Sequence, residues 1–148
     1  MIARELMTSD PALVLADDTV ATAAELMRTR GVGMLPVVDS LEVRRLIGVI
    51  TDRDIVVRHV AFGHGPEAKV RTHMSAGPLI TVIPATSPQG VAEKMMRFKV
   101  RRLPVVDAAD RVVGIVTQAD LARRIGPDDP ELVERVVEAI SSPGALVA

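Results

Sequence analysis

The sequence predicts a mixed α/β (α+β) fold made of two copies of one β-α-β-β-α unit, with an additional helix at the C-terminus. One observation is a repeat: Leu35–Asp39, with the sequence Leu-Pro-Val-Val-Asp, recurs as Leu103–Asp107. A second is the shared pattern Thr-x-x-Asp, which follows an aliphatic strand at Thr51–Asp54 and again at Thr117–Asp120. The two offsets, 68 and 66 residues (103 − 35 and 117 − 51), nearly agree. The chain is therefore predicted to be an internal duplication.

Each copy contains the same expected elements in the same order: a short strand, a helix, two strands and a second helix. Thr19 is placed to cap the first helix of copy one, and Thr86 or Ser87 to cap its counterpart. Apolar residues recur at helical spacing along both helices. The expected first strands are 13–15 and 80–82, the first helices begin at these caps, and the second helices span 52 to about 61 and 118 to about 125.

The predicted organisation has three segments: copy one at 7–64, copy two at 74–126, and a tail at 128–148. Phe62–Pro66 is rich in Gly and Pro and separates the copies. The tail is expected to form an amphipathic helix with Pro130 in its first turn, outside the duplication. Its apolar stripe comprises Leu132, Val133, Val136, Val137 and Ile140.

Composition excludes several function classes. The net charge of −1 and the aromatic content of 1% offer neither a basic patch nor a stacking platform for nucleic acid. With no cysteine, the chain has no disulfide, thiolate zinc ligand or thiol nucleophile. No apolar run approaches the ~18 residues of a membrane span. We expect a cytoplasmic protein that binds neither nucleic acid nor membrane.

The repeated motifs carry a resemblance to a known family. Arg101–Asp107, Arg-Arg-Leu-Pro-Val-Val-Asp, followed by Gly114–Asp120, with the pattern Gly-apolar-apolar-Thr-x-x-Asp, resembles a CBS domain. Two such units in tandem resemble a Bateman module, and the likeness covers about Met7–Gly126. The tail at Ala139–Pro143 is also similar to small stand-alone CBS pairs of the actinobacterial hypoxia-response type.

The resemblance implies two units packed about a pseudo-two-fold axis, with two inter-repeat clefts that bind AMP, ADP, ATP or S-adenosylmethionine. It also implies a flat homodimer. Asp54 and Asp120 would accept hydrogen bonds from ribose hydroxyls. Thr51 and Thr117 would donate to phosphate or ribose. The residues before each proline would line the adenine or phosphate region: Met34, Leu35, Arg102 and Leu103.

Elementary chemistry agrees with a phosphate at these positions. A helix N-terminus offers unpaired N–H groups and a partial positive charge. Arg53, Arg101 and Arg102 are candidate phosphate clamps. Copy one has Gly33 and Met34 where copy two has the two adjacent arginines, so the two clefts are predicted to be unequal.

The Thr-x-x-Asp pattern also has a purely structural interpretation. Thr at the start of a helix and an acid three residues later form a capping box, which stabilises a helix by about 1 kcal/mol without any ligand. For Thr51, Asp54, Thr117 and Asp120 both interpretations stay open.

The histidines, His59, His64 and His73, lack the spacing of metal ligands, so we expect dispersed surface residues and no metal site. No paired acids and no Ser-His-Asp arrangement can be identified. We therefore expect no enzyme activity and no required cofactor. The leading hypothesis is a regulatory module that binds an adenosine-type nucleotide and signals to an unidentified protein partner. The alternative is a ligand-free dimerisation or interaction module that uses the stripe of the C-terminal helix.

Overall fold

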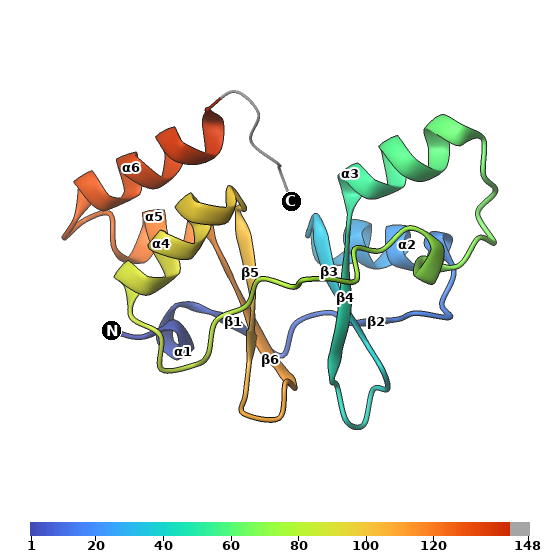
Figure 1. Ribbon diagram of the computed structural model, residues 1–148, viewed down its shortest axis with the longest axis horizontal. Helices are drawn as coiled ribbons and strands as arrows, with labels where there is room; N and C mark the ends of the chain where they lie inside the picture. The colour runs from blue at the N-terminus through green and yellow to red at the C-terminus, as the bar shows by residue number, and fades with distance from the viewer. Residues whose placement is uncertain (143–148) are drawn as a thin grey trace. The chain divides into compact units, whose positions relative to one another are not determined.

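The computed structural model describes residues 1–142, in which the chain forms two compact units (Figure 1). Unit 1 consists of Met1–Asp10, Ile80–Ala108 and the chain from Val113 onward, and unit 2 of Pro11–Leu79 and Ala109–Val112. Each unit contains one three-stranded sheet with helices, so the predicted mixed α/β class is confirmed. Residues 143–148 of the predicted tail lie outside the described residues.

Unit 2 holds the sheet β2-β3-β4. Strand β2 pairs with β3 in parallel, with Val14 opposite Val37, and β3 pairs with β4 antiparallel. A parallel pair needs a crossover, which the first helix of copy one supplies. The expected strand at 13–15 is present, and the expected helix from Asp52 begins as an α-turn and continues as π and 3-10 turns. The elements are β2 (Val14–Leu15), α2 (Val20–Arg30), β3 (Met34–Val38), β4 (Leu46–Thr51), α3 (Asp52–Asp54), η1 (Ile55–His59), η2 (Val60–Phe62) and η3 (Val70–Thr72).

Unit 1 holds the sheet β1-β6-β5. The strand predicted at 80–82 is present only as an isolated bridge between Val82 and Val105, so the prediction of a full strand there is wrong. The chain turns immediately afterwards, because Ile83 N donates to Thr86 Oγ1 at 3.2 Å. The elements are α1 (Ala3–Leu6), β1 (Thr8–Ser9), α4 (Pro88–Phe98), β5 (Arg102–Val106), β6 (Val112–Thr117), α5 (Gln118–Arg124) and α6 (Pro130–Ser141).

The first helix of each copy begins with a side-chain cap. Thr19 Oγ1 accepts a hydrogen bond from Thr22 N at 3.1 Å at the start of α2. Ser87 Oγ accepts from Gly90 N at 3.0 Å at the start of α4, where Pro88 occupies the first turn. These bonds satisfy amides that would otherwise have no partner within the helix. The predicted caps are confirmed, with Ser87 rather than Thr86 in the second copy.

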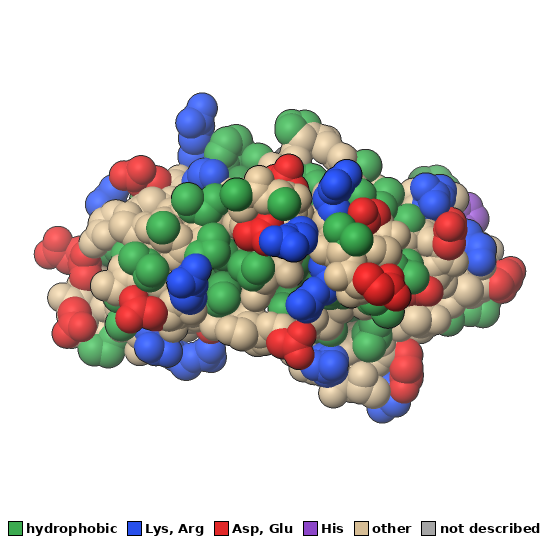
Figure 2. Space-filling view, turned by 90° about the horizontal axis from the view of Figure 1, so that it is seen from below, with side chains coloured by type: hydrophobic (Ala, Val, Ile, Leu, Met, Phe, Trp, Pro, Cys, Tyr) green, Lys and Arg blue, Asp and Glu red, His purple; other side chains and the backbone are tan. Residues whose placement is uncertain are grey.

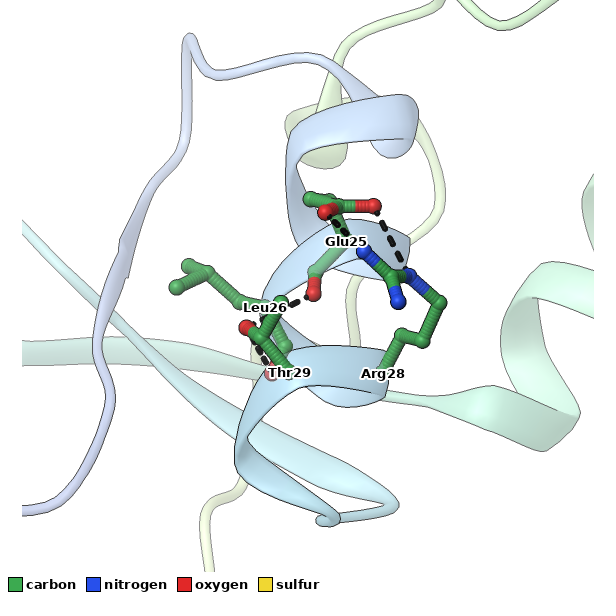
Figure 3. Close-up of polar contacts among 4 residues, drawn as sticks. All are labelled: Glu25, Leu26, Arg28 and Thr29. Atoms are coloured by element: carbon green, nitrogen blue, oxygen red, sulfur yellow. Dashed lines mark hydrogen bonds and ion pairs between the residues drawn. The ribbon is translucent and has the colours of Figure 1, made fainter.

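The outer side of α2 is held by contacts within one turn (Figure 3). The guanidinium of Arg28 donates to both carboxylate oxygens of Glu25. Thr29 Oγ1 donates to Glu25 O at 2.9 Å. All of these groups are exposed, and an exposed pair three residues apart on a helix contributes only a few tenths of a kcal/mol.

Helix α6 packs beside α4 and α5 in unit 1 (Figure 1). Leu132, Val136 and Ile140 are buried in the core of that unit, whereas Val137 is 41% exposed. The proposal that the apolar stripe of this helix forms a dimer is therefore wrong for most of the stripe. The stripe is buried against the unit's own helices, which leaves little of it for a partner.

The cores of the two units differ in size. The core of unit 1 includes residues from α4, β5, β6, α5 and α6, whereas unit 2 has no counterpart of α6. The larger core contains Ala3, Leu6, Val82, Val91, Ala92, Met95, Leu103, Val105, Val116, Leu121, Ile125, Leu132, Val136 and Ile140. The smaller contains Val14, Ala16, Ala23, Met27, Leu35, Val37, Ile50 and Val70.

The segment that precedes each copy belongs to the unit of the other copy. Strand β1 pairs with β6 in unit 1, where an added Cβ at Gly114 would contact the Met7 side chain. In unit 2, Val49 pairs with Ser75, and an added Cβ at Gly48 would lie 2.8 Å from Met74 Sδ. Met7, which precedes copy one, therefore packs against a strand glycine of copy two, and Met74, which precedes copy two, packs against the equivalent glycine of copy one.

Acidic and basic side chains are interspersed over the face shown in Figure 2. This distribution agrees with a net charge of −1. Among the described residues, no helix combines the length and the apolar character that a membrane crossing requires.

Candidate functional site

Thr117 and Asp120 form a reciprocal capping box at the start of α5 in unit 1. Asp120 N donates to Thr117 Oγ1 at 3.2 Å, and Thr117 N donates to Asp120 Oδ2 at 2.8 Å. The Thr117 hydroxyl also donates to Oδ2 at 2.8 Å, and Arg123 Nη2 donates to Oδ1 at 2.7 Å. A carboxylate has about four lone-pair sites, so these three bonds leave one lone pair on Oδ1 unused, and the Asp120 side chain itself is buried.

A hollow of about 290 Å³ adjoins this capping box within unit 1. Arg101 is exposed and Arg102 is half-buried at the start of β5. Gln118 N donates to Arg101 O at 2.8 Å, which fixes the backbone of Arg101 against the first turn of α5. The volume is near the lower limit of small-molecule pockets. The hollow is lined by Arg101, Arg102, Thr117, Gln118, Ala119 and Ala122.

Unit 2 repeats the same cap with different surroundings. Asp54 N donates to Thr51 Oγ1 at 3.1 Å, and Thr51 N donates to Asp54 Oδ2 at 2.9 Å. Asp52 N donates to Gly33 O at 2.9 Å, the equivalent of the bond that fixes the first arginine of the other copy. Gly33 has no side chain, so this position supplies no cation. Arg58 Nε lies 3.8 Å from Asp54 Oδ1, a looser contact than its counterpart in unit 1.

The predicted lining residues lie in different environments in the structure. Leu35 and Leu103 are completely buried and belong to the cores of their units. Met34 is also buried, whereas Arg53 is exposed on α3. The two leucines therefore stabilise the fold and offer no accessible side-chain surface to a ligand. The structure brings together Arg101, Arg102 and Thr117, with Asp120 bonded to the threonine.

The prediction that the histidines are dispersed surface residues is wrong. His59 and His73 are buried, and their rings lie close to His64, which is exposed. Burial is the main cause that lowers the pKa of His73 from its usual 6.5, followed by repulsion from His59 and His64. The cluster was missed because its members come from irregular turns that no periodic pattern aligns. Within the described residues, these three side chains are the candidate metal ligands.

The comparisons with known proteins agree with this geometry. The CBS domain family matches residues 3–59 and 70–127. Hypoxic response protein 1 of Mycobacterium tuberculosis is 35% identical over 147 residues, which cover 99% of this chain and 98% of that protein. The chain belongs to the CBS domain family. The resemblance read from the repeated motifs of this CBS pair is confirmed.

Solved structures show the same fold. The crystal structure of Hypoxic Response Protein I (HRPI) with two coordinated zinc ions has a TM-score of 0.74 and 36% identity, covering 84% of this chain and 98% of that chain. The CBS pair of MJ0100, in complex with 5-methylthioadenosine and S-adenosyl-L-methionine, has a TM-score of 0.75 and 28% identity, covering 86% and 97%. CBSX2 in complex with AMP has a TM-score of 0.71 and 28% identity, covering 84% and 95%.

The CBS pair also resembles part of an enzyme. Inosine-5'-monophosphate dehydrogenase of Korarchaeum cryptofilum is 34% identical over 123 residues. Those residues make up 83% of this chain but 23% of the dehydrogenase, so the similarity concerns one segment of that enzyme.

Proposed function

We propose that this CBS pair is a regulatory module that binds an adenosine-type nucleotide and signals its occupancy to a protein partner. The observation that carries the proposal is the hollow beside the capping box of α5, where Arg101 and Arg102 lie with Thr117. Guanidinium groups form strong, often bidentate hydrogen bonds with phosphate. The three ligands of MJ0100 and CBSX2, which are all adenosine derivatives, support this class of ligand.

The free acceptor site on Asp120 limits how the sugar binds. Thr117 and Arg123 already donate three hydrogen bonds to this carboxylate. One ribose hydroxyl is therefore expected to donate to Oδ1, and bidentate binding of both hydroxyls would require Arg123 to move. The cap and the ligand contact are compatible, because they use different lone pairs of the same group.

The half-site of unit 1 is proposed as the one for phosphorylated ligands. Unit 2 has Gly33 in place of Arg101, and its remaining candidate cation, Arg53, lies on α3. AMP, ADP or ATP is therefore expected to bind in unit 1. An uncharged adenosine derivative such as 5-methylthioadenosine is the better candidate for unit 2. A ligand acts as a signal only through different affinities for two conformations of the module.

A thermal-melt panel tests the proposal. AMP, ADP, ATP and S-adenosylmethionine are each added to the purified chain, and the melting temperature is measured against free ligand. A ligand at 100 times its dissociation constant stabilises the fold by roughly 2.7 kcal/mol. Arg101→Gln with Arg102→Gln is expected to weaken AMP binding by about 10-fold or more. Arg97→Gln, a change of an exposed arginine on α4 that does not line the hollow, should leave AMP binding unchanged. No melting shift with any of the four ligands contradicts the proposal.

Matched variants of the two capping threonines test whether each threonine binds a ligand or only caps a helix. Thr51→Ala and Thr117→Ala are each expected to cost about 1 kcal/mol of unfolding free energy, because each loses a helix cap. Thr117→Ala should also lose its AMP response, while Thr51→Ala keeps it. If both variants lose stability and both keep the response, the threonines are caps only.

A second candidate function is ligand-free association of two copies. It is favoured by large exposed apolar side chains on the segment from η1 to η2, where Val60 is 62% and Phe62 is 74% exposed. Exposed apolar groups of this kind mark interaction surfaces when they are contiguous. Val60→Glu should halve the mass measured by sedimentation if this segment forms a dimer. An unchanged mass assigns the exposed residues no role in association.

A further inference from the structure

All three histidines of the chain meet in unit 2. His59 ends the π-helical turn η1, His64 follows the turn after η2, and His73 directly follows η3. His59 Nδ1 lies 3.1 Å from His73 Nε2, and His64 Nδ1 lies 3.3 Å from the same nitrogen. One ring nitrogen from each residue lies within 4.8 Å of the other two.

Hydrogen bonds among neutral rings do not fully account for this arrangement. A nitrogen of a neutral imidazole carries either one hydrogen or one lone pair. His73 Nε2 therefore makes one full hydrogen bond, yet two ring nitrogens approach it at bonding distance. A cation at the centre of the cluster would use one lone pair from each ring, so it satisfies all three at once.

The spacing fits a first-row metal ion. Zn²⁺–N distances of about 2.0–2.1 Å in a tetrahedral site place neighbouring ligand nitrogens about 3.3 Å apart. The two measured distances to His73 already have this spacing. The third edge is at most 4.8 Å, and His64 is exposed, so its ring is free to rotate toward His59.

The backbone holds the ligands in place without a metal. His64 N donates to His59 O at 3.1 Å, and His73 N donates to Val70 O at 2.9 Å. Gly63, in the left-handed conformation with φ +72°, reverses the chain between the first two ligands.

We propose that His59, His64 and His73 form a mononuclear Zn²⁺ site with a fourth position open to water. Imidazole is a preferred ligand of Zn²⁺, and three protein ligands with an open position are a known zinc arrangement. The ion would link η1, the loop around His64 and η3, which are separated by up to 14 residues of sequence. This site shares no residue with the hollow at Arg101 and Arg102.

Metal titration of the 148-residue chain tests the proposal. The protein is treated with EDTA, dialysed, and titrated with Zn²⁺ in competition with a chromogenic chelator. One equivalent is expected to bind per chain and to raise the melting temperature. Because the chain has no other histidine, ¹H–¹⁵N spectra of the imidazoles report on this cluster alone, and all three rings should shift. Co²⁺, used as a probe, should give the intense visible bands of a four-coordinate ion.

Matched variants decide whether the histidines are the ligands. His64→Gln removes an exposed ligand that the fold does not need, and it should weaken Zn²⁺ binding by at least about 100-fold. Glu67→Gln changes an exposed carboxylate in the same loop and should leave the affinity unchanged. Arg101→Gln with Arg102→Gln should also bind Zn²⁺ normally, which separates this site from the nucleotide site. The proposal is overturned if the unaltered chain binds less than one equivalent, or if His64→Gln binds Zn²⁺ as tightly.

Discussion

Unit 1 and unit 2 derive from two copies of one sequence unit, yet they carry different polar groups around the same framework. Both copies cap their second helix with a Thr-x-x-Asp box of nearly identical distances. Both pack a methionine against a strand glycine, Met7 on Gly114 and Met74 on Gly48. In unit 1 two arginines lie beside the cap, whereas in unit 2 the histidine cluster lies in the turns that follow the cap.

The comparison distinguishes the features that both copies need to fold from the polar side chains that only one copy has. The shared features satisfy backbone amides or fill the core, and both copies require them. The different features lie at the starts of strands and in irregular turns, where a substitution costs little packing energy. Unit 1 is therefore the better candidate for anionic ligands, and unit 2 for a cation.

The largest expected effect tests the extra helix of unit 1. Ile140→Ala removes a buried side chain of α6 and should lower the free energy of unfolding by about 2–5 kcal/mol. Val137→Ala, on the exposed side of the same helix, should change it by less than about 0.5 kcal/mol. Urea denaturation measures both. Equal, small effects would mean that α6 is not part of the core of unit 1.

Gly114 and Gly48 occupy equivalent positions in the two units, so alanine substitutions there compare how closely each glycine is packed. An added Cβ at Gly114 would lie 2.8 Å from the backbone oxygen of Thr8, whereas at Gly48 the oxygen of Ser75 is 3.0 Å away. Gly114→Ala is therefore expected to cost about 2–3 kcal/mol and Gly48→Ala about 1 kcal/mol, both measured by urea denaturation. A larger loss for Gly48→Ala would contradict the closer backbone contact at Gly114.

Helices α2 and α4 both end at a residue in the left-handed conformation, but the residue is glycine in one and lysine in the other. Gly31 has φ +64° and Lys99 has φ +54°. Gly31→Ala should cost about 1 kcal/mol for backbone reasons alone, because the added Cβ would meet no atom within 4 Å. Lys99→Gly should gain up to about 1 kcal/mol, reduced by loss of the bond from Lys99 Nζ to Ser142 Oγ. Thermal melts measure both, and a neutral Gly31→Ala would show that this strain is absent.

The smallest expected effect is a pH dependence that belongs to unit 2. Burial lowers the pKa of His73 below 6.5; His59, His64 and Arg58 act in the same direction, and Asp54 opposes them. Below pH 6.5 the unfolded chain therefore binds more protons at this residue than the folded chain. The contribution of His73 to stability is full above that pH and is lost as the pH falls through the folded pKa.

Urea midpoints at about pH 7.5 and about pH 5.5, with EDTA present, measure this effect. His73→Gln removes the titrating group, so the variant should lose less stability over the same interval than the unaltered chain. Equal losses would assign the pH dependence to other groups.

The sequence predicted the features that depend on neighbouring residues. The caps at Thr19, Thr51, Ser87 and Thr117 each use a hydrogen bond between residues three apart, so a local pattern is enough to locate them. The sequence was less successful at the strand expected at 80–82, because pairing depends on a partner strand and on the turn that follows.

By itself, the sequence determined that the chain is a duplicated β-α-β-β-α unit, because a repeat is visible without any knowledge of contacts. The tertiary structure alone decided that β1 joins the sheet of the second copy, that most of the stripe of α6 is buried, and that the three histidines converge. These features depend on contacts between residues far apart in the chain or on irregular turns, and neither leaves a periodic pattern in the sequence.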